Sequence, residues 1–255
     1  MNLAAIGIKS VGAMDGDVTA FLTTTGITDG TIASALNNLV SGLKTNGLWS
    51  KIIAFYPLVG GTATLHSYNL KNTSQYQISW SGSLTHNNMG VTGMGGYGNT
   101  GIVPSTALSL NDVHLSIYVN SGNSSSDGCD MGSQSTGNTN RLFIARYNWV
   151  INANMNDATA GFSAAGNSGF CYGSRKSADT RIRGANTTYE SSSVSSLALN
   201  THPIYVMAVN YHDLSAGVVY RRHASYSVGS GLTSGELMTF NTLIQAFQTA
   251  LGRNV

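Results

Sequence analysis

Apolar residues recur at helical spacing near both ends of this sequence, whereas its middle alternates between apolar and polar positions. The N-terminal pattern forms one helical stripe from Ile32, Leu36, Leu39, Val40 and Leu43. Thr28 is a candidate N-cap, and Asn46 with Gly47 is a candidate left-handed stop. A shorter helix over residues 17–24 precedes this one. We therefore predict a helical cap over residues 15–61, whose apolar face must be buried against another layer.

The end of the chain carries a second helical pattern with a defined start. Thr233 and Glu236 have the spacing of a capping box, in which each residue satisfies a backbone N–H of the other. The apolar repeat behind it consists of Leu237, Phe240, Leu243, Ile244, Phe247 and Leu251. We expect this helix, over residues 233–251, to pack with the N-terminal cap against one face or edge of the intervening structure.

Short segments between the helical blocks have the two-residue period of β-strands. Apolar and polar positions alternate over residues 75–80 and 113–119, and residues 204–211 are apolar on both faces, as in a central strand. The glycine- and asparagine-rich residues 81–101 indicate an extended loop. Further strands are predicted over residues 141–147, 169–174, 180–184 and 218–228. Strands separated by turn signals favour a mainly β sandwich, which we place at residues 62–255.

Composition and charge exclude some classes of partner for this chain. Only 9% of its 255 residues are charged, against roughly 25% in an average soluble domain. The net charge of +2 is not concentrated in a basic cluster, so the sequence indicates no positively charged surface that would attract nucleic acid. No stretch approaches the roughly 20 apolar residues of a membrane-spanning helix, and residues 1–14 lack the pattern of a signal peptide.

We interpret residues 1–14 as a leader or as an arm that attaches to another protein. The sequence leaves open whether Cys129 and Cys171 pair.

Few residues have the spacing of a catalytic or metal site. A retaining glycosidase needs two carboxylates about 5 Å apart, but the only glutamates are Glu190 and Glu236, and the second is explained as a helix cap. The six histidines show no paired metal-binding spacing. For Asp127 and Asp130, in a glycine- and serine-rich segment, a plain turn and a calcium site are the alternatives. We predict a protein that is not an enzyme and holds no cofactor.

Aromatic and polar side chains in the middle of the chain are the candidates for a binding site. Sugar binding needs aromatic faces that stack on pyranose rings and polar groups that hold hydroxyls. We select His86, Tyr97, Asn99, Tyr147 and Trp149 as this set. For each residue taken alone, anchoring of a loop or contact with another subunit is the competing interpretation.

Three stretches of the chain resemble a module found in structural proteins of tailed bacteriophages. They are AFLTTTGITDGTIASALNNLVSGLKTNGLWSKIIAFYPLVGGTATLHSYNLKN at residues 20–72, IYVMAVN at residues 204–210, and VGSGLTSGELMTFNTLIQAFQTALGRNV at residues 228–255. That module has a laminin-G-like or concanavalin A-like jelly-roll sandwich. Many laminin-G-like domains also finish with G-x-G-L-T-x-x-E and a closing helix. The resemblance covers most of residues 15–255 and includes no catalytic motif.

This resemblance implies a component of the virion, such as a tail-fibre, head-fibre or tail-associated subunit, that attaches to host-surface glycans without catalysis. It implies a homo-oligomer, with a trimer favoured, that contacts other virion proteins through residues 1–14. Two alternatives stay open. One is a purely architectural protein that decorates or bridges virion proteins, with its loop aromatics buried between subunits. The other is a glycan-degrading enzyme of related fold, which would need a convergent carboxylate pair.

Overall fold

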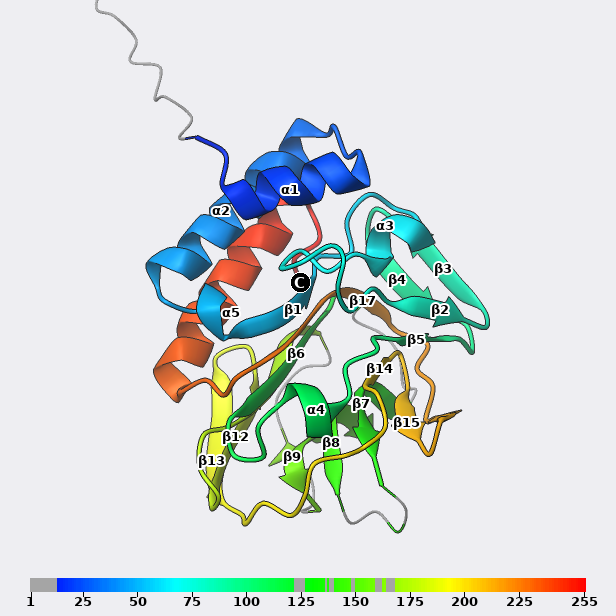
Figure 1. The fold of residues 1–255 in the computed structure, drawn as a ribbon, viewed down its shortest axis with the longest axis vertical. Coiled ribbons are helices and arrows are strands. Elements are labelled where there is room, and N and C mark those ends of the chain that lie inside the picture. The colour runs from blue at the N-terminus through cyan, green and yellow to red at the C-terminus, as the bar shows by residue number, and fades with distance from the viewer. Residues whose placement is uncertain are drawn as a thin grey trace, which may run out of the picture.

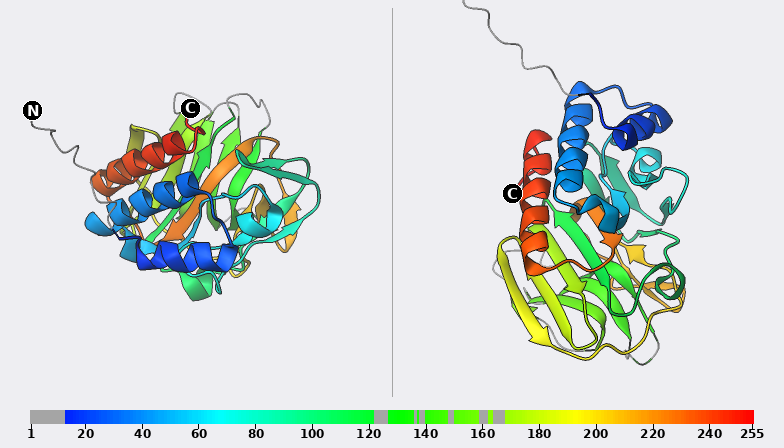
Figure 2. Two further views of the ribbon diagram at one scale, coloured as in Figure 1. Left: turned by 90° about the horizontal axis from the view of Figure 1, so that it is seen from above. Right: turned by 60° about the vertical axis from the view of Figure 1, so that its left-hand side comes forward.

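The structure is a computed structural model that describes residues 13–121, 127–135, 137, 140–147, 150–158, 162–163 and 168–255. Residues 1–12 of the predicted arm and the predicted site residue Trp149 lie outside this part of the chain. The described residues form two β-sheets packed face to face, with helices from both ends of the chain on one side (Figure 1, Figure 2). The predicted mainly β sandwich with N-terminal helices and a C-terminal helix is confirmed.

Sheet A has the strand order β13-β12-β11-β6-β17-β4-β3, and β1 also pairs with β17. Its strands are β1 (Ile52–Tyr56), β3 (Leu84–Asn87), β4 (Gly90–Gly93), β6 (Val113–Val119), β11 (Gly169–Arg175), β12 (Thr180–Ala185), β13 (Thr188–Ser193) and β17 (Arg222–Gly229). All its pairings are antiparallel.

Sheet B has the order β10-β9-β8-β7-β14-β5-β2, with β15 and β16 attached beside β7. Its strands are β2 (Ser79–Ser81), β5 (Tyr97–Asn99), β7 (Gly128–Gln134), β8 (Arg141–Tyr147), β9 (Val150–Asp157), β10 (Phe162–Ser163), β14 (Tyr205–Val206), β15 (Val209–Tyr211) and β16 (Leu214–Ala216). The pairing of β15 with β7 is parallel.

The helices begin and end where local capping chemistry favours it. They are α1 (Gly16–Thr25), α2 (Gly30–Thr45), the 3-10 turn η1 (Trp49–Lys51), α3 (Ala63–Ser67), α4 (Pro104–Ala107) and α5 (Ser234–Ala250). The capping box of Thr233 and Glu236 is present at the start of α5. The cap of α2 is Asp29 rather than the predicted Thr28, because the Asp29 carboxylate accepts from the backbone N–H groups of Thr31 and Ile32.

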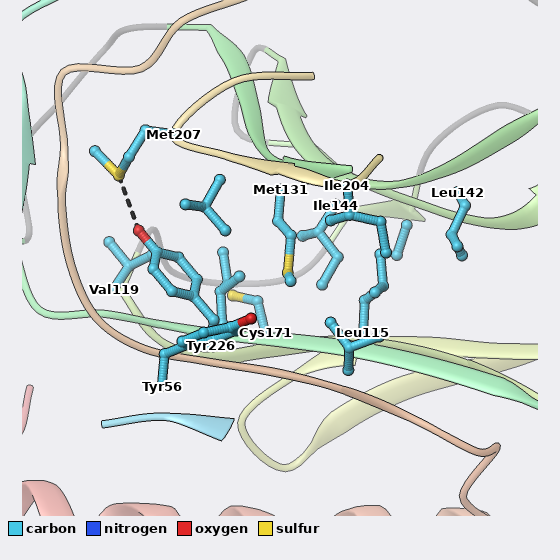
Figure 3. Close-up of a cluster of buried hydrophobic side chains, with 14 of the residues drawn as sticks. Tyr56, Leu115, Val119, Met131, Leu142, Ile144, Cys171, Ile204, Met207 and Tyr226 are labelled. Carbon is cyan, nitrogen blue, oxygen red and sulfur yellow. Dashed lines mark hydrogen bonds between the residues drawn. The ribbon is translucent and has the colours of Figure 1, made fainter. Parts of the chain in front are cut away.

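Apolar side chains fill the space between the two sheets. Leu115 and Tyr226 of sheet A pack there with Met131 and Ile144 of sheet B, and all four are fully buried (Figure 3). The Tyr226 hydroxyl also donates to the Met207 sulfur across 3.0 Å. This core holds the two sheets together and leaves each with one outer face.

The outer face of sheet A is covered by α1, α2 and α5. Phe55, Tyr118 and Phe170 of this sheet pack against Phe240 and other apolar side chains of the helices. Consequently β6 is buried on both faces, although its sequence alternates between polar and apolar residues. The two ends of the chain meet over this face, as predicted, with α2 and α5 side by side (Figure 2).

Residues 52–56, which we placed within the helical cap, form strand β1. This strand pairs antiparallel with β17. Phe55 packs toward the helices, whereas Ala54 and Tyr56 enter the core between the sheets. The helical part of the cap therefore ends at η1, because backbone pairing with β17 competes successfully with continuation of the helix.

Residues 81–101 contain three short strands instead of the predicted extended loop. A Cβ at Gly90, which has a φ of +124°, would lie 2.0 Å from the His223 carbonyl oxygen. The glycines here therefore permit close pairing of β4 with β17 rather than a loop.

Two other predicted strands are interrupted by residues with a left-handed backbone. Residues 204–211 divide into β14 and β15 because Met207 has a φ of +67°. In the segment 75–80, Tyr76 has a φ of +56°, so only its end belongs to strand β2. In both places a residue with positive φ interrupts an apolar or alternating run.

Candidate functional site

The outer face of sheet B differs from that of sheet A because no helix of the described residues packs over its centre. On β8, Leu142 and Ile144 point into the core between the sheets. Strand alternation therefore places Arg141, Phe143 and Tyr147 on the outer face.

A groove of about 470 Å³ lies on this outer face. Its walls come from β7, β8, β9 and the β15–β16 hairpin, which brings together residues that are far apart in the sequence. The described residues that line it are Gln134, Arg141, Phe143, Tyr147, Asn152, Val209, Ala216 and Gly217. We refer to this as the sheet B groove.

The floor of the sheet B groove is apolar. Phe143, Val209 and Ala216 pack there with Cys129 and Ala145. Gly132 of β7 pairs with Phe143 of β8, beside the floor. Only glycine fits at this position, because a Cβ on residue 132 would lie 2.2 Å from the Phe143 Cβ. Its φ of +152° adds a second reason for glycine. The ring of Phe143 can therefore lie close to the backbone of β7.

Polar side chains surround this apolar floor. The guanidinium carbon of Arg141 lies 5.9 Å from the centre of the Phe143 ring, which is cation–π distance. Tyr147 is 41% exposed. Partial burial raises the pKa of its hydroxyl, and the nearby Cys129 and Asp127 raise it further, so the phenol stays neutral and can donate a hydrogen bond. The amides of Gln134 and Asn152 complete the lining. An apolar floor ringed by planar polar groups suits a flat ligand that carries hydroxyls.

Of the site residues predicted from the sequence, Tyr147 lines the sheet B groove. Tyr97 and Asn99 lie on β5, separated from β8 in the sheet by β14 and β7. Neighbouring strands are about 4.8 Å apart, so roughly 14 Å separates β5 from β8. Tyr97 stacks on Tyr205 with 4.6 Å between ring centroids. These two residues therefore belong to a second polar and aromatic area of sheet B rather than to the groove.

His86 is placed away from the other predicted site residues, on β3 of sheet A. Its Nδ1 lies 3.0 Å from Nδ1 of the buried His66, and its ring packs edge-on against Trp80. Burial lowers the pKa of His86 and lowers that of His66 to about 3, so both imidazoles are neutral near pH 7. These contacts agree with the anchoring interpretation of His86.

Asp130, one of the two aspartates considered for calcium, is fully buried between the sheets. Its carboxylate contacts Arg221 at 2.6 Å, Arg146 at 3.5 Å and His223 at 2.8 Å. Burial alone raises the pKa of this carboxyl, but Arg221, the His223 hydrogen bond and Arg146 together lower it to about 2. A carboxylate already neutralised by two guanidinium groups is a poor calcium ligand. The described residues contain no group of three metal-binding side chains.

Four residues that line the groove were not predicted from the sequence, namely Gln134, Arg141, Phe143 and Asn152. A usable signal was present, because alternation within the predicted strand 141–147 places Arg141 and Phe143 on the same face as Tyr147. Gln134 and Asn152 reach the same groove only through the pairing of β7 and β9 with β8.

Comparison with solved structures shows likeness in fold at low sequence identity. Domain 4 of the extracellular arabinanase AbnA from Geobacillus stearothermophilus, solved in complex with arabinotriose, matches with a TM-score of 0.53 and 10% identity, covering 75% of this chain and 98% of that domain. A mutant Trypanosoma rangeli sialidase that displays trans-sialidase activity matches with a TM-score of 0.58 and 9% identity, over 90% of this chain and 38% of the sialidase.

The binding domain of botulinum neurotoxin serotype D matches with a TM-score of 0.50 and 10% identity, over 76% of this chain and 52% of that domain. No protein family model and no curated protein sequence matches this chain. The chain therefore shares its β-sandwich fold with a domain solved in complex with arabinotriose and with parts of a sialidase and a toxin binding domain.

Proposed function

We propose that this chain is a carbohydrate-binding β-sandwich whose ligand lies in the sheet B groove. The observation that carries the proposal is the asymmetry of the two outer faces. Helices cover sheet A, whereas sheet B presents an apolar floor surrounded by Arg141, Tyr147, Gln134 and Asn152. The fold shared with the arabinanase domain, which was solved with arabinotriose, supports the same function.

The lining of the groove matches the chemistry of a sugar ring. Tyr147, which is 41% exposed, offers aromatic surface to the C–H groups of a pyranose face, whereas Phe143 is buried and forms the apolar floor beneath it. Gln134 and Asn152 can each donate and accept hydrogen bonds, as vicinal hydroxyls require. The Tyr147 hydroxyl is neutral and provides a further donor. Affinity then comes from the aromatic surface, and orientation comes from the amides.

We propose further that binding proceeds without catalysis. None of the eight described residues that line the groove is a carboxylate. Elsewhere, Asp157 is buried between Arg175 and Arg181, and Glu190 pairs with Arg183. Glycoside hydrolysis needs two carboxyl groups aimed at one glycosidic bond. The lack of a carboxylate among the described groove residues supports a binding role instead.

The place of this protein in a particle is a separate part of the proposal, and it rests on the sequence resemblance alone. We propose a laminin-G-like jelly roll that serves as a virion subunit of the tail-fibre or head-fibre type. It assembles as a homo-oligomer, with a trimer favoured, and attaches to other virion proteins through residues 1–14. The sheet B groove then provides contact with host-surface glycans.

A glycan-array screen of the purified protein tests the proposal, with the oligomeric mass measured by light scattering on the same preparation. We expect saturable binding that Tyr147→Ala weakens about three- to tenfold, the equivalent of one lost aromatic contact. The matched control is Tyr189→Ala, because Tyr189 is 43% exposed but lies on β13 of sheet A. Absence of binding by a folded oligomer would overturn the glycan proposal and favour the architectural alternative.

A further inference from the structure

Arg141 is the single charged residue among the eight described residues of the sheet B groove. It lies at the start of β8, where it pairs with Gln134 of β7. Its guanidinium group is positioned over Phe143 by the cation–π contact described above. The cation therefore lies at the edge of an apolar floor instead of extending freely into solvent.

The Arg141 guanidinium group has no hydrogen bond and no ion pair with any residue that the structure describes. Its Nε is shielded from solvent and has no hydrogen-bond partner among those residues. Other arginines of the sandwich differ, since Arg175, Arg181 and Arg183 each contact a carboxylate. A shielded donor without a partner destabilises a protein. A ligand that accepts from the guanidinium group would offset part of that cost.

We propose that Arg141 recognises a carboxylate on the ligand, so that the sheet B groove selects acidic saccharides over neutral ones. This inference rests on the proposed function. A guanidinium group presents two parallel N–H donors that match the two oxygens of a carboxylate. The neighbouring Gln134 and Asn152 then face the hydroxyls, and Tyr147 faces the ring. The ligand class is a sugar acid, of the uronic or sialic type, at an accessible position of a glycan.

The test compares saccharides that differ only in charge, by isothermal titration calorimetry at low ionic strength. The probes are oligogalacturonate with its methyl ester, and sialyllactose with its methyl ester. We expect the wild-type protein to bind the acidic member of at least one pair about tenfold more tightly. This preference should shrink as salt is added, because ions screen a partly exposed charge pair.

Two variants separate this inference from the proposed function. Arg141→Gln should abolish the preference, so that the acidic and neutral members of a pair bind with similar affinity. Arg141→Lys should restore the preference only in part because lysine lacks the planar fork. Tyr147→Ala should weaken both members of a pair equally. Circular dichroism verifies that each variant is folded.

The outcomes are distinguishable. Equal binding of acidic and neutral members by the wild-type protein overturns the inference and leaves the proposed function intact. Equal weakening of both members by Arg141→Gln overturns it as well, since Arg141 would then contribute only to the shape of the groove. Binding of sulfated lactose without binding of either carboxylate probe also contradicts it. No binding of any saccharide, charged or neutral, overturns the proposed function itself.

Discussion

Asp130 and His223 join the two sheets inside the sandwich. Asp130 comes from β7 of sheet B and His223 from β17 of sheet A, and Asp130 Oδ1 lies 2.8 Å from His223 Nε2. Both side chains are fully buried. Arg221 and Arg146 contact the same carboxylate. The buried Asp130 carboxylate therefore contacts two guanidinium groups and one neutral imidazole between the two sheets.

Replacing Asp130 should destabilise the fold strongly. Asp130→Asn removes the negative charge and leaves the Arg221 and Arg146 cations buried, a change that costs about 3–5 kcal/mol in comparable sites. Urea unfolding followed by circular dichroism measures the effect. The control is Asp213→Asn, because Asp213 also contacts a histidine but its side chain is 69% exposed. Equal stability of the two variants would show that the buried cluster contributes little.

The buried histidines should make stability fall as the solution becomes acidic. Burial lowers the pKa of His114 from 6.5 to about 4 and that of His66 to about 3. The unfolded chain therefore takes up protons first, so this stability is complete above about pH 6.5 and is lost as pH falls toward the folded-state values. His114→Gln should flatten the decline between about pH 6.5 and 4 in urea titrations. Parallel curves for the variant and wild type would contradict this assignment.

Residue 90 should tolerate only glycine, because β4 lies close to β17 at this position. Gly90→Ala places a Cβ against the His223 carbonyl oxygen at a left-handed φ, so we expect a loss of about 2–4 kcal/mol or failure to fold. Gly235→Ala is the control, since no atom lies within 4 Å of the added Cβ in α5. That change should raise the melting temperature slightly, because alanine favours helix. A neutral result for Gly90→Ala would count against close pairing of these strands.

The two cysteines should remain as thiols that react only after unfolding. Cys129 lies in the apolar cluster on the outer face of sheet B, whereas Cys171 lies in the core between the sheets. Both are free and buried, and burial raises the pKa of each thiol. A thiol reagent should therefore label neither in the native protein and both in denaturant. Tyr220→Cys, at a position 54% exposed, supplies a thiol that should react at once. Rapid native labelling of Cys171 would contradict its placement.

Much of the fold could be predicted because its signals are local. The apolar stripe of α2 and the capping box of Thr233 and Glu236 involve residues within a few turns of one helix. Alternation over residues 113–119 likewise marks β6. The failures occurred where long-range pairing competed with local pattern. Residues 52–56 form a strand because they pair with β17. Residues 81–101 form short strands because glycine at residue 90 lets β4 lie close to the backbone of β17.

The candidate site was less predictable than the fold. Tyr147 was selected and lines the sheet B groove, but Tyr97 and Asn99 lie on β5 and His86 lies on the other sheet. Residues that are similar in character along the sequence were separated because successive strands enter different sheets. Sequence order does not determine that assignment.

Residue type and short spacing were enough to predict the two amphipathic helical blocks, the β-rich middle and the scarcity of paired carboxylates. Which outer face the helices cover, and which side chains meet on the other face, depended on tertiary contacts. The apolar faces of α2 and α5 had to be buried, and they covered sheet A. Strand pairing then brought Gln134, Arg141 and Asn152 beside the hairpin that contains Val209 and Ala216. Such contacts depend on burial and pairing between distant segments, which no local pattern specifies.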